Sequence, residues 1–308
     1  MLTNVFTPHF GGHQTFSLRH TWIPKAVPLV RADPQILFNL EETMACMGIG
    51  KNMAMSVRHW LESARIVEIS TREDEKSIRV HHLTTEAQIM IEAEQEGSDV
   101  YLERFDSLWL IHWFLVSSSV KNALWTFVFN IFSQREFTRE NLVEQVQRWC
   151  ELNEHHVPSI KVLKNDIGTF LNMYCYTPVR SEKELQHSLS SPFKELDLIS
   201  YSPIRGMYHL HRNSFGAISN DVVGFCILDY LHRNDWPSTV SFDELYYRPF
   251  SPGRVFQLSE EAMVKYLEIF SMMREHRYRF DTTAGVRQLI NLGSSEVDKY
   301  SILKKIYS

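Results

Sequence analysis

Basic and imidazole side chains gather behind two consecutive glycines near the start of the sequence. Gly11 and Gly12 are followed by His13, Arg19, His20 and Lys25. Histidine exchanges protons near neutral pH, and the cations of arginine and lysine bind phosphate oxygens. Such a group could hold a scissile phosphate, with His13 positioning or activating water and Arg19 binding the phosphate. His20 or Lys25 would then stabilise the charge that develops.

The same segment also has an ordinary structural interpretation. The two glycines can form a connecting turn, and the histidines can bond to backbone groups. Phe16, Leu18 and Trp22 would then pack against the first domain. Both interpretations remain open at the level of sequence.

A second candidate for phosphate chemistry lies near the other end of the chain. Arg254 follows a Pro-Gly turn, and Asp281 and Thr282 are predicted to precede a helix, whose first amides favour anions. Asp281 is also a candidate ligand for Mg²⁺ or another divalent metal. The alternative is that Asp281 and Thr282 only cap the helix and that Arg254 pairs with an acidic neighbour. The sequence has no phosphate-binding glycine loop, so we expect no nucleotide cofactor.

The elements expected between residues 41 and 83 form a winged helix-turn-helix. Residues 41–47 predict a helix, residues 48–50 supply a glycine-containing turn, and residues 51–64 resume helical spacing. Two short strands follow at residues 66–70 and 77–82, joined by a charged tip. An arrangement of this kind typically binds DNA, although it also serves as a packing or protein-docking module.

The helix expected over residues 51–64 would be the recognition helix. Its apolar residues fall on one face, and its polar residues fall on the other. We expect Lys51, Asn52 and Arg58 to contact DNA, the two cations through phosphate.

Residues 98–216 repeat this pattern, following a domain at residues 1–97. A helix is predicted to begin at Ser159, with Lys161 and Lys164 on the face opposite its apolar residues. Strands are expected at residues 196–202 and 206–211, as in a second wing. The two lysines therefore extend the predicted DNA interface, which also includes Arg254.

Residues 217–308 are expected to form a C-terminal α+β module. The pattern predicts a helix over residues 221–231, strands at 240–242 and 255–258, a helix after Ser259 and a last helix after Asp281 and Thr282. The whole chain is thus predicted to be α+β and mostly helical, with tandem winged-helix-like modules that carry small β-hairpins.

Composition limits the classes of function. The 308 residues include 32 basic and 37 acidic side chains, for a formal charge of −5, so any contact with DNA must depend on local basic patches. The four cysteines are scattered, which favours a reducing cytoplasm over a disulfide framework. Polar residues interrupt the most hydrophobic stretch, 108–132, which predicts buried helices rather than a membrane span. We expect a soluble cytoplasmic protein.

Four segments together carry a resemblance to a known family. They are residues 12–16 (GHQTF) with Arg19 and Trp22, residues 48–53 (GIGKNM) with Arg58 and residues 60–61 (WL), residues 251–258 (SPGRVFQL), and residues 281–285 (DTTAG). The chain thereby resembles, over nearly its whole length, an SspB-type family, long catalogued as a domain of unknown function and found in operons for single-strand DNA phosphorothioation.

The resemblance implies a DNA-nicking component of a phosphorothioate modification and phage-defence system. A nick would loosen one strand so that sulfur could replace a non-bridging phosphate oxygen. The partners that the resemblance implies are a cysteine desulfurase, an ATPase and an ATP-pyrophosphatase-like sulfur-transfer enzyme. Two other hypotheses remain: a non-catalytic DNA-binding adaptor that recruits these enzymes, and a transcriptional regulator of the operon.

Overall fold

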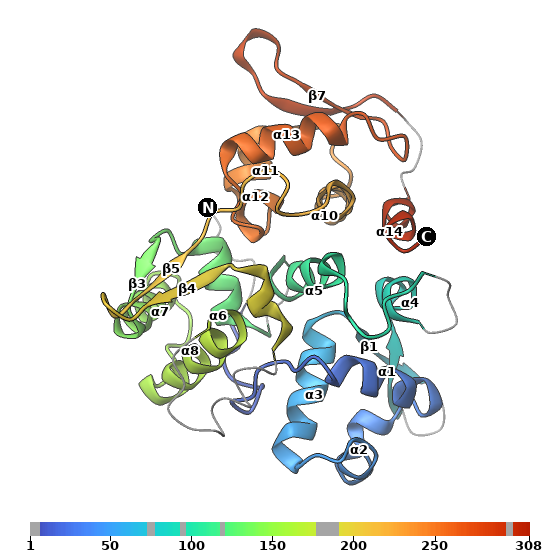
Figure 1. Ribbon diagram of the computed structural model, residues 1–308, viewed down its shortest axis with the longest axis vertical. Helices are drawn as coiled ribbons and strands as arrows, with labels where there is room; N and C mark the ends of the chain where they lie inside the picture. Colours follow the sequence, from blue (N-terminus) through green and yellow to red (C-terminus); the bar gives the residue numbers. More distant parts are fainter. Residues whose placement is uncertain (1–6, 73–77, 93–96, 118–120, 177–190, 294–297) are drawn as a thin grey trace.

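The computed structural model describes residues 7–72, 78–92, 97–117, 121–176, 191–293 and 298–308. Over these residues the chain is α+β and rich in helix, as predicted, and its strands form three small antiparallel sheets. We group the elements into three modules in chain order, which lie at the lower right, the left and the top of Figure 1. The domain boundaries after residues 97 and 216 stay predictions.

The N-terminal module contains the helix pair and hairpin that the sequence predicts. Its elements are α1 (Trp22–Ala32), a 3₁₀ turn (Ile36–Phe38), α2 (Leu40–Met47), α3 (Lys51–Ser63), β1 (Val67–Arg72), β2 (Ile78–Leu83) and α4 (Thr85–Ile91). Gly48 ends α2 in the left-handed conformation, at φ 66°, which lets the chain reverse into α3. The tip of the hairpin, residues 73–77, lies outside the described residues.

The middle module places a three-stranded sheet beside its helices. Its elements are α5 (Phe105–Ser117), α6 (Ala123–Thr126), a π-helical turn (Phe127–Ile131), β3 (Glu136–Phe137), α7 (Arg139–Leu152), α8 (Ile160–Tyr174), a 3₁₀ turn (Pro192–Leu196), β4 (Ile199–Ser202) and β5 (Met207–Leu210). The strand order is β3-β5-β4. Thr138 and Ser159 cap α7 and α8 through their hydroxyls, and the helix that the sequence predicts to begin at Ser159 is present.

In the C-terminal module, as in the middle module, helices lie between the first strand and a final antiparallel hairpin. It contains α10 (Asn220–Arg233), β6 (Thr239–Ser241), α11 (Phe242–Tyr247), α12 (Pro252–Val255), α13 (Glu260–Phe270), β7 (Tyr278–Asp281), a 3₁₀ turn (Thr283–Gly285) and β8 (Gln288–Asn291), and is followed by α14 (Tyr300–Ile306). Its strand order, β6-β8-β7, matches the order in the middle module: the strand before the helices pairs with the last strand of the hairpin.

Two elements predicted for the C-terminal module are wrong. Residues 255–258 do not form a strand: Val255 ends α12, and Leu258 makes one isolated bridge to Asn213. The apolar run resembles a strand because its residues are buried. The helix predicted directly after Asp281 and Thr282 is replaced by a hairpin. Asp281 ends β7, a 3₁₀ turn follows, and the chain then forms β8, in which Gln288 pairs with Asp281.

The modules meet around α5, whose residues from Ser107 to Ser117 are all buried. It packs against α6, α10 and α12, and α14 packs against both α10 and α4 (Figure 1). A helix that is buried on every side has a hydrophobic sequence even when it does not span a membrane. Among the described residues, no helix is long and apolar enough to cross a membrane.

Candidate functional site

His13 lies in a buried contact between the N-terminal segment and α8. Its Nδ1 accepts a hydrogen bond from the backbone N–H of Thr15 at 3.1 Å, so Nε2 carries the proton and donates to Asp166 Oδ1, also at 3.1 Å. The other carboxylate oxygen of Asp166 accepts from the N–H of Gly11 at 2.9 Å. Because His13 is only 2% exposed and both ring nitrogens have partners, the imidazole fastens the N-terminal segment to the middle module.

Aromatic rings surround the His13 imidazole. It stacks on Trp60 of α3, with 6.0 Å between the centroids, and meets His59 and Trp125 edge-on. Burial, and next the neighbouring His13, lower the pKa of His59 to about 3, so its ring is neutral at neutral pH. His59 bonds to the side-chain oxygen of Asn122 at 3.0 Å. These contacts join α3 to the middle module.

The other residues of the predicted phosphate-handling group have different neighbours. The guanidinium of Arg19 lies over the rings of Phe16 and Trp22, and burial lowers its pKa. His20 approaches the carbonyl oxygen of Leu102 through Nε2 at 3.3 Å, and Lys25 is exposed on α1. His13, by contrast, faces α3 and α8. The sequence analysis missed Asp166, whose signal is a carboxylate on the otherwise apolar face of α8.

The lysines predicted to contact DNA lie on exposed helix faces. Lys51 and Asn52 are exposed in the first turn of α3, and Lys161 and Lys164 are exposed on α8. Arg58 differs, because its Nε donates to Glu62 at 2.9 Å and its guanidinium lies over the ring of Phe38. These lysines are available to a ligand, whereas Arg58 has partners within the protein.

The two candidates from the C-terminal module lie on different elements. Arg254 of α12 donates to the carbonyl oxygens of Asn130 and Phe132, at 2.9 and 3.1 Å. Asp281, at the end of β7, accepts hydrogen bonds from the N–H and hydroxyl of Thr283. No group of three or more histidine, cysteine, aspartate or glutamate side chains that could hold a metal is found within the described ranges.

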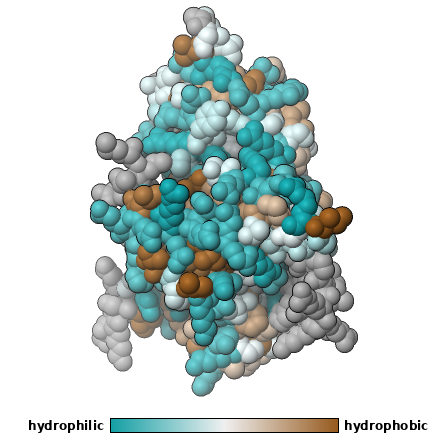
Figure 2. Space-filling model, turned by 90° about the vertical axis from the view of Figure 1, so that its left-hand side faces the viewer, coloured by the Kyte–Doolittle hydropathy of each residue, from teal (hydrophilic) through white to brown (hydrophobic). Residues whose placement is uncertain are grey.

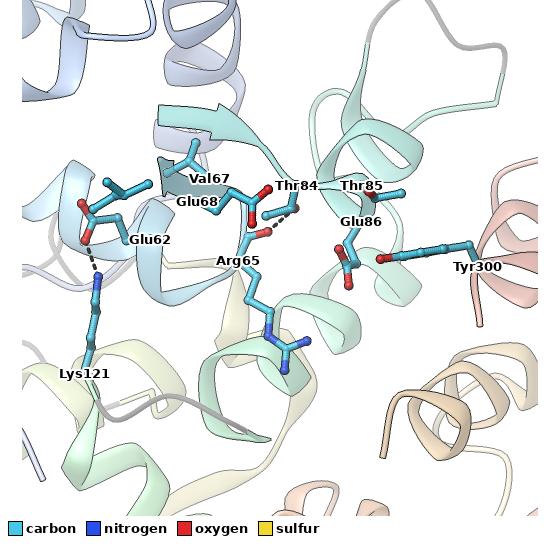
Figure 3. A pocket seen from close by; sticks show the side chains of 10 residues that line it. Glu62, Arg65, Val67, Glu68, Thr84, Thr85, Glu86, Lys121 and Tyr300 are labelled. Carbon is cyan, nitrogen blue, oxygen red and sulfur yellow. Dashed lines mark hydrogen bonds and ion pairs between the residues drawn. The ribbon is translucent and has the colours of Figure 1, made fainter. Parts of the chain in front are cut away.

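A polar pocket of about 510 Å³ opens beside the hairpin of the N-terminal module (Figure 3). Its charged lining residues are Glu62, Glu68, Glu86, Arg65 and Lys121. Burial raises the pKa of Glu62, but hydrogen bonds donated by His81, Lys121 and Arg58 outweigh it and lower the pKa to about 2. The carboxylate is therefore ionised at neutral pH and joins α3 to β2 and to Lys121, which precedes α6.

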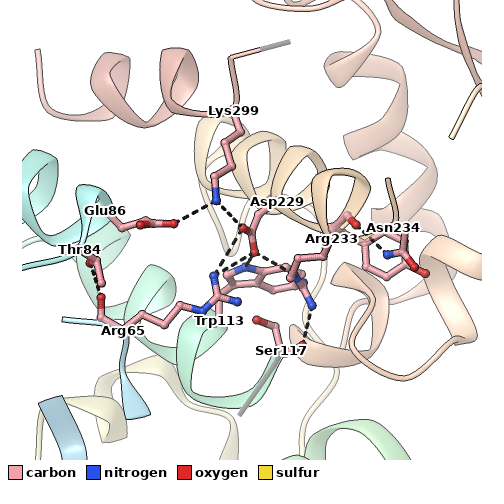
Figure 4. Close-up of polar contacts among 10 residues, drawn as sticks. Arg65, Thr84, Glu86, Trp113, Ser117, Asp229, Arg233, Asn234 and Lys299 are labelled. Carbon is pink, nitrogen blue, oxygen red and sulfur yellow. Dashed lines mark hydrogen bonds and ion pairs between the residues drawn. The ribbon is translucent and has the colours of Figure 1, made fainter. Parts of the chain in front are cut away.

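Behind the pocket, a network of charges connects all three modules (Figure 4). Asp229 of α10 has no exposed surface and accepts from Trp113 Nε1 at 2.9 Å, Arg233 Nε at 3.2 Å and Lys299 Nζ at 3.2 Å. Arg65 also pairs with it, at 3.4 Å. Burial alone would raise the pKa of Asp229, but the three cations lower it strongly.

The Asp229 network was not predicted from the sequence. Its partners come from positions far apart in the chain, and Lys299 also bonds to Glu86 of α4 at 3.1 Å. The one signal is an aspartate in the otherwise apolar run between Val222 and Leu231. Its geometry indicates a structural role, because its charges pair with one another and hold the modules in position.

Comparison with known proteins identifies the family of this chain. The family described as a protein of unknown function, DUF4007, matches residues 10–307. The chain belongs to the DUF4007 family. A comparison with curated proteins finds no match.

Two solved structures share the fold of this DUF4007 chain. They are a magnesium ion-bound crystal structure of SspB and a second SspB crystal structure, with TM-scores of 0.84 and 0.83. Each is 23% identical to this chain, and each alignment covers 99% of this chain and 90% of the other. The resemblance to an SspB-type family is thereby confirmed.

Proposed function

We propose that this DUF4007 protein binds DNA in a bacterial phosphorothioate modification and phage-defence system and takes part in nicking one strand. The observation that carries the DNA-binding part is the exposed lysine face of α8, Lys161 and Lys164, together with Lys51 at the start of α3. Cations on helix faces bind the phosphates of duplex DNA. The phosphorothioation setting is supported by the fold shared with SspB.

The helix pair and hairpin of each module support a winged-helix-like arrangement. In the N-terminal and middle modules, α2 precedes α3, α7 precedes α8, and an antiparallel hairpin follows. We infer that α3 and α8 act as the recognition helices and meet a groove or its phosphates. Asn52 would then add a polar contact next to Lys51. The third counterpart, α13, exposes Glu260, Glu261 and Glu268 and is not assigned to DNA.

The nicking part of the proposal assigns phosphate chemistry to the segment with His13, Arg19, His20 and Lys25. Because both ring nitrogens of His13 are occupied, its activation of water would require this segment to leave Asp166. Among the described residues, no group of three or more histidine, cysteine, aspartate or glutamate side chains could hold Mg²⁺, so we derive no step through a metal.

Purified protein with supercoiled plasmid tests the proposal directly. We expect binding to duplex DNA, measured by fluorescence polarisation, and conversion of supercoiled to open-circular plasmid on a gel. Reactions with Mg²⁺, Mn²⁺ or a chelator determine whether nicking depends on a metal. If the purified, folded protein does not bind duplex DNA, the proposal as a whole is wrong.

The same assay separates the alternatives. DNA binding that leaves the plasmid intact supports an adaptor, and co-purification with the desulfurase, the ATPase or the ATP-pyrophosphatase-like enzyme would identify what it recruits. Strong preference for the protein's own promoter over other duplexes supports a transcriptional regulator instead. The assay with these partners added determines whether nicking needs one of them.

Substitution of His13 distinguishes a catalytic role from a structural one. If His13 acts on phosphate, His13→Ala and Arg19→Ala reduce the nicking rate of folded protein while DNA affinity stays near that of the parent. If His13 only fastens the segment, His13→Ala lowers Tm, and folded protein keeps the parental nicking rate. His82→Ala is the matched control, because His82 is an exposed histidine on β2.

A further inference from the structure

Three arginines from the middle and C-terminal modules meet at the join between these modules. Arg135 precedes β3, Arg212 follows β5, and Arg254 lies in α12. Arg135 and Arg254 are half-buried, whereas Arg212 is exposed. Two of the three come from outside the segments that carry the family resemblance.

Shared neighbours show that the three side chains converge. The guanidinium of Arg135 donates to Gln257 Oε1 at 2.9 Å and approaches the carbonyl oxygen of His211, the residue before Arg212, at 3.5 Å. Gln257 in turn donates to the backbone carbonyl oxygen of Arg254 at 2.6 Å. Arg135 is therefore adjacent to both of the other arginines.

A close contact between α11 and α12 completes the group. Arg212 Nη1 reaches the hydroxyl oxygen of Tyr246 at 3.4 Å. A Cβ atom on Gly253 would lie 2.6 Å from the Cα of Tyr246, so only glycine lets α12 approach α11 this closely. The sequence PGRV thus fixes Arg254 next to the tyrosine that Arg212 contacts.

The described residues provide these three arginines with neutral hydrogen-bond acceptors. Within the described part of the chain, no ion pair joins Arg135, Arg212 or Arg254 to an acidic side chain, and their hydrogen bonds go to carbonyl, amide and phenol oxygens. Other arginines of these modules do have acidic partners: Arg205 pairs with Glu136, and Arg248 with Glu244. Burial, and then the neighbouring arginines, lower the pKa of Arg135 and Arg254.

Like charges held together without an anion are unfavourable, and a bound anion relieves the repulsion. Each guanidinium has five N–H donors, and the contacts above use only part of them. The planar fork of donors matches the oxygens of a phosphate group.

We propose that Arg135, Arg212 and Arg254 form a phosphate-binding site between the middle and C-terminal modules. Its ligand is a phosphate group, supplied either by the backbone of a nucleic acid or by free phosphate. The nucleic-acid source rests on the proposed function and would extend the DNA interface beyond α3 and α8 to this join.

Two measurements on the full chain test the site. The first is the Tm with pyrophosphate at an ionic strength matched by chloride, which we expect to rise for the parent and much less for Arg212→Gln and Arg135→Gln. The second is duplex DNA affinity against salt, where each lost contact reduces the log–log slope by about 0.9. Arg248→Gln is the matched control, because it removes one positive charge of the C-terminal module from an existing ion pair.

The two measurements separate this proposal from the proposed function. If the parent binds DNA but neither variant changes the affinity, the salt slope or the response to pyrophosphate, the arginine site is wrong and DNA binding stands. If the parent fails to bind DNA but pyrophosphate raises its Tm only when Arg212 is present, the site stands with free phosphate as its ligand. If the parent responds to neither probe, both proposals are wrong.

Discussion

The middle and C-terminal modules share one strand order, but the helices α8 and α13 that precede their hairpins expose charges of opposite sign. Helix α8 precedes the β4–β5 hairpin and exposes Lys161 and Lys164. Helix α13 precedes the β7–β8 hairpin and exposes Glu260, Glu261 and Glu268, with Lys265 as its exposed cation. In Figure 1 these two helices lie in different parts of the molecule, α8 at the lower left and α13 at the top.

Two helices at the same place in a shared strand order thus have different surfaces, so topology alone does not assign a ligand. The buried face of α13 is apolar, and that of α8 is apolar except for Asp166 and Thr169, because both faces pack inside the protein. Only the exposed face is free to vary, and its charge determines whether a polyanion is attracted or repelled. The face drawn in Figure 2 is mostly hydrophilic, with hydrophobic side chains in scattered groups, so charge distinguishes such surfaces better than hydropathy does.

The largest effect is expected for Asp229→Asn, which tests whether the buried charge network holds the three modules in fixed positions. The substitution leaves Arg65, Arg233 and Lys299 without their shared anion. We expect the free energy of unfolding to fall by about 3–5 kcal/mol, measured by chemical denaturation.

Asp221→Asn is the matched control for Asp229→Asn. Asp221 lies on the same helix and pairs with Lys305, but its side chain is more exposed, so the expected loss is about 0–1 kcal/mol. Equal losses for the two variants would mean that the buried network does not hold the modules together.

Acid is expected to destabilise the N-terminal module by protonating Glu62. Its folded pKa of about 2 is lower than the ordinary 4.5, so the carboxylate adds stability above about pH 4.5 that is lost as the pH falls toward 2. At about 1.36 kcal/mol per unit, the contribution is at most about 3 kcal/mol. Glu62→Gln should lose this stability at pH 7 and flatten the acid limb of the stability curve. The exposed pocket residue Glu68 supplies the control, Glu68→Gln, and matching curves for both variants would refute the assignment.

Exchanging the charges on the two helices tests the comparison itself. Lys161→Glu with Lys164→Glu should weaken binding to duplex DNA and reduce the slope of log affinity against log salt by about 1.8, since two phosphate contacts are lost. The control is Glu261→Lys with Glu268→Lys on α13, which changes the charge by the same amount in the opposite direction. Because α13 is assigned no DNA contact, this variant should leave the slope of log affinity against log salt near the parental value. A slope that responds only to the α13 variant would reverse the assignment of the two helices.

The smallest effect distinguishes two cations of one helix. Lys51→Ala should reduce the salt slope by about 0.9 without changing stability. Arg58→Ala should instead lower the Tm slightly, because Arg58 contacts Glu62 and Phe38. A folded double variant with parental affinity and salt dependence would remove α3 from the DNA interface.

Local pattern determined much of the secondary structure from the sequence alone. Hydroxyl caps at Thr138 and Ser159 and the left-handed glycine at residue 48 mark helix ends, since these depend on residues close in the chain. Alternating faces on α3 and α8 predicted which lysines are exposed. The run at residues 255–258 was misjudged as a strand because buried apolar residues look alike in a short helix, a loop and a strand.

Only the tertiary structure decided which polar side chains meet. Asp166 bonds to His13, which lies far before it in the sequence. Asp229 pairs with Arg65, far before it, and with Lys299, far after it. Sequence alone does not give these contacts, because a buried carboxylate is stabilised by whichever cations and donors the packing of the modules brings near. For the same reason, the sequence indicated Arg254 but not Arg135 and Arg212. These two arginines are brought beside Arg254 only where the middle and C-terminal modules meet.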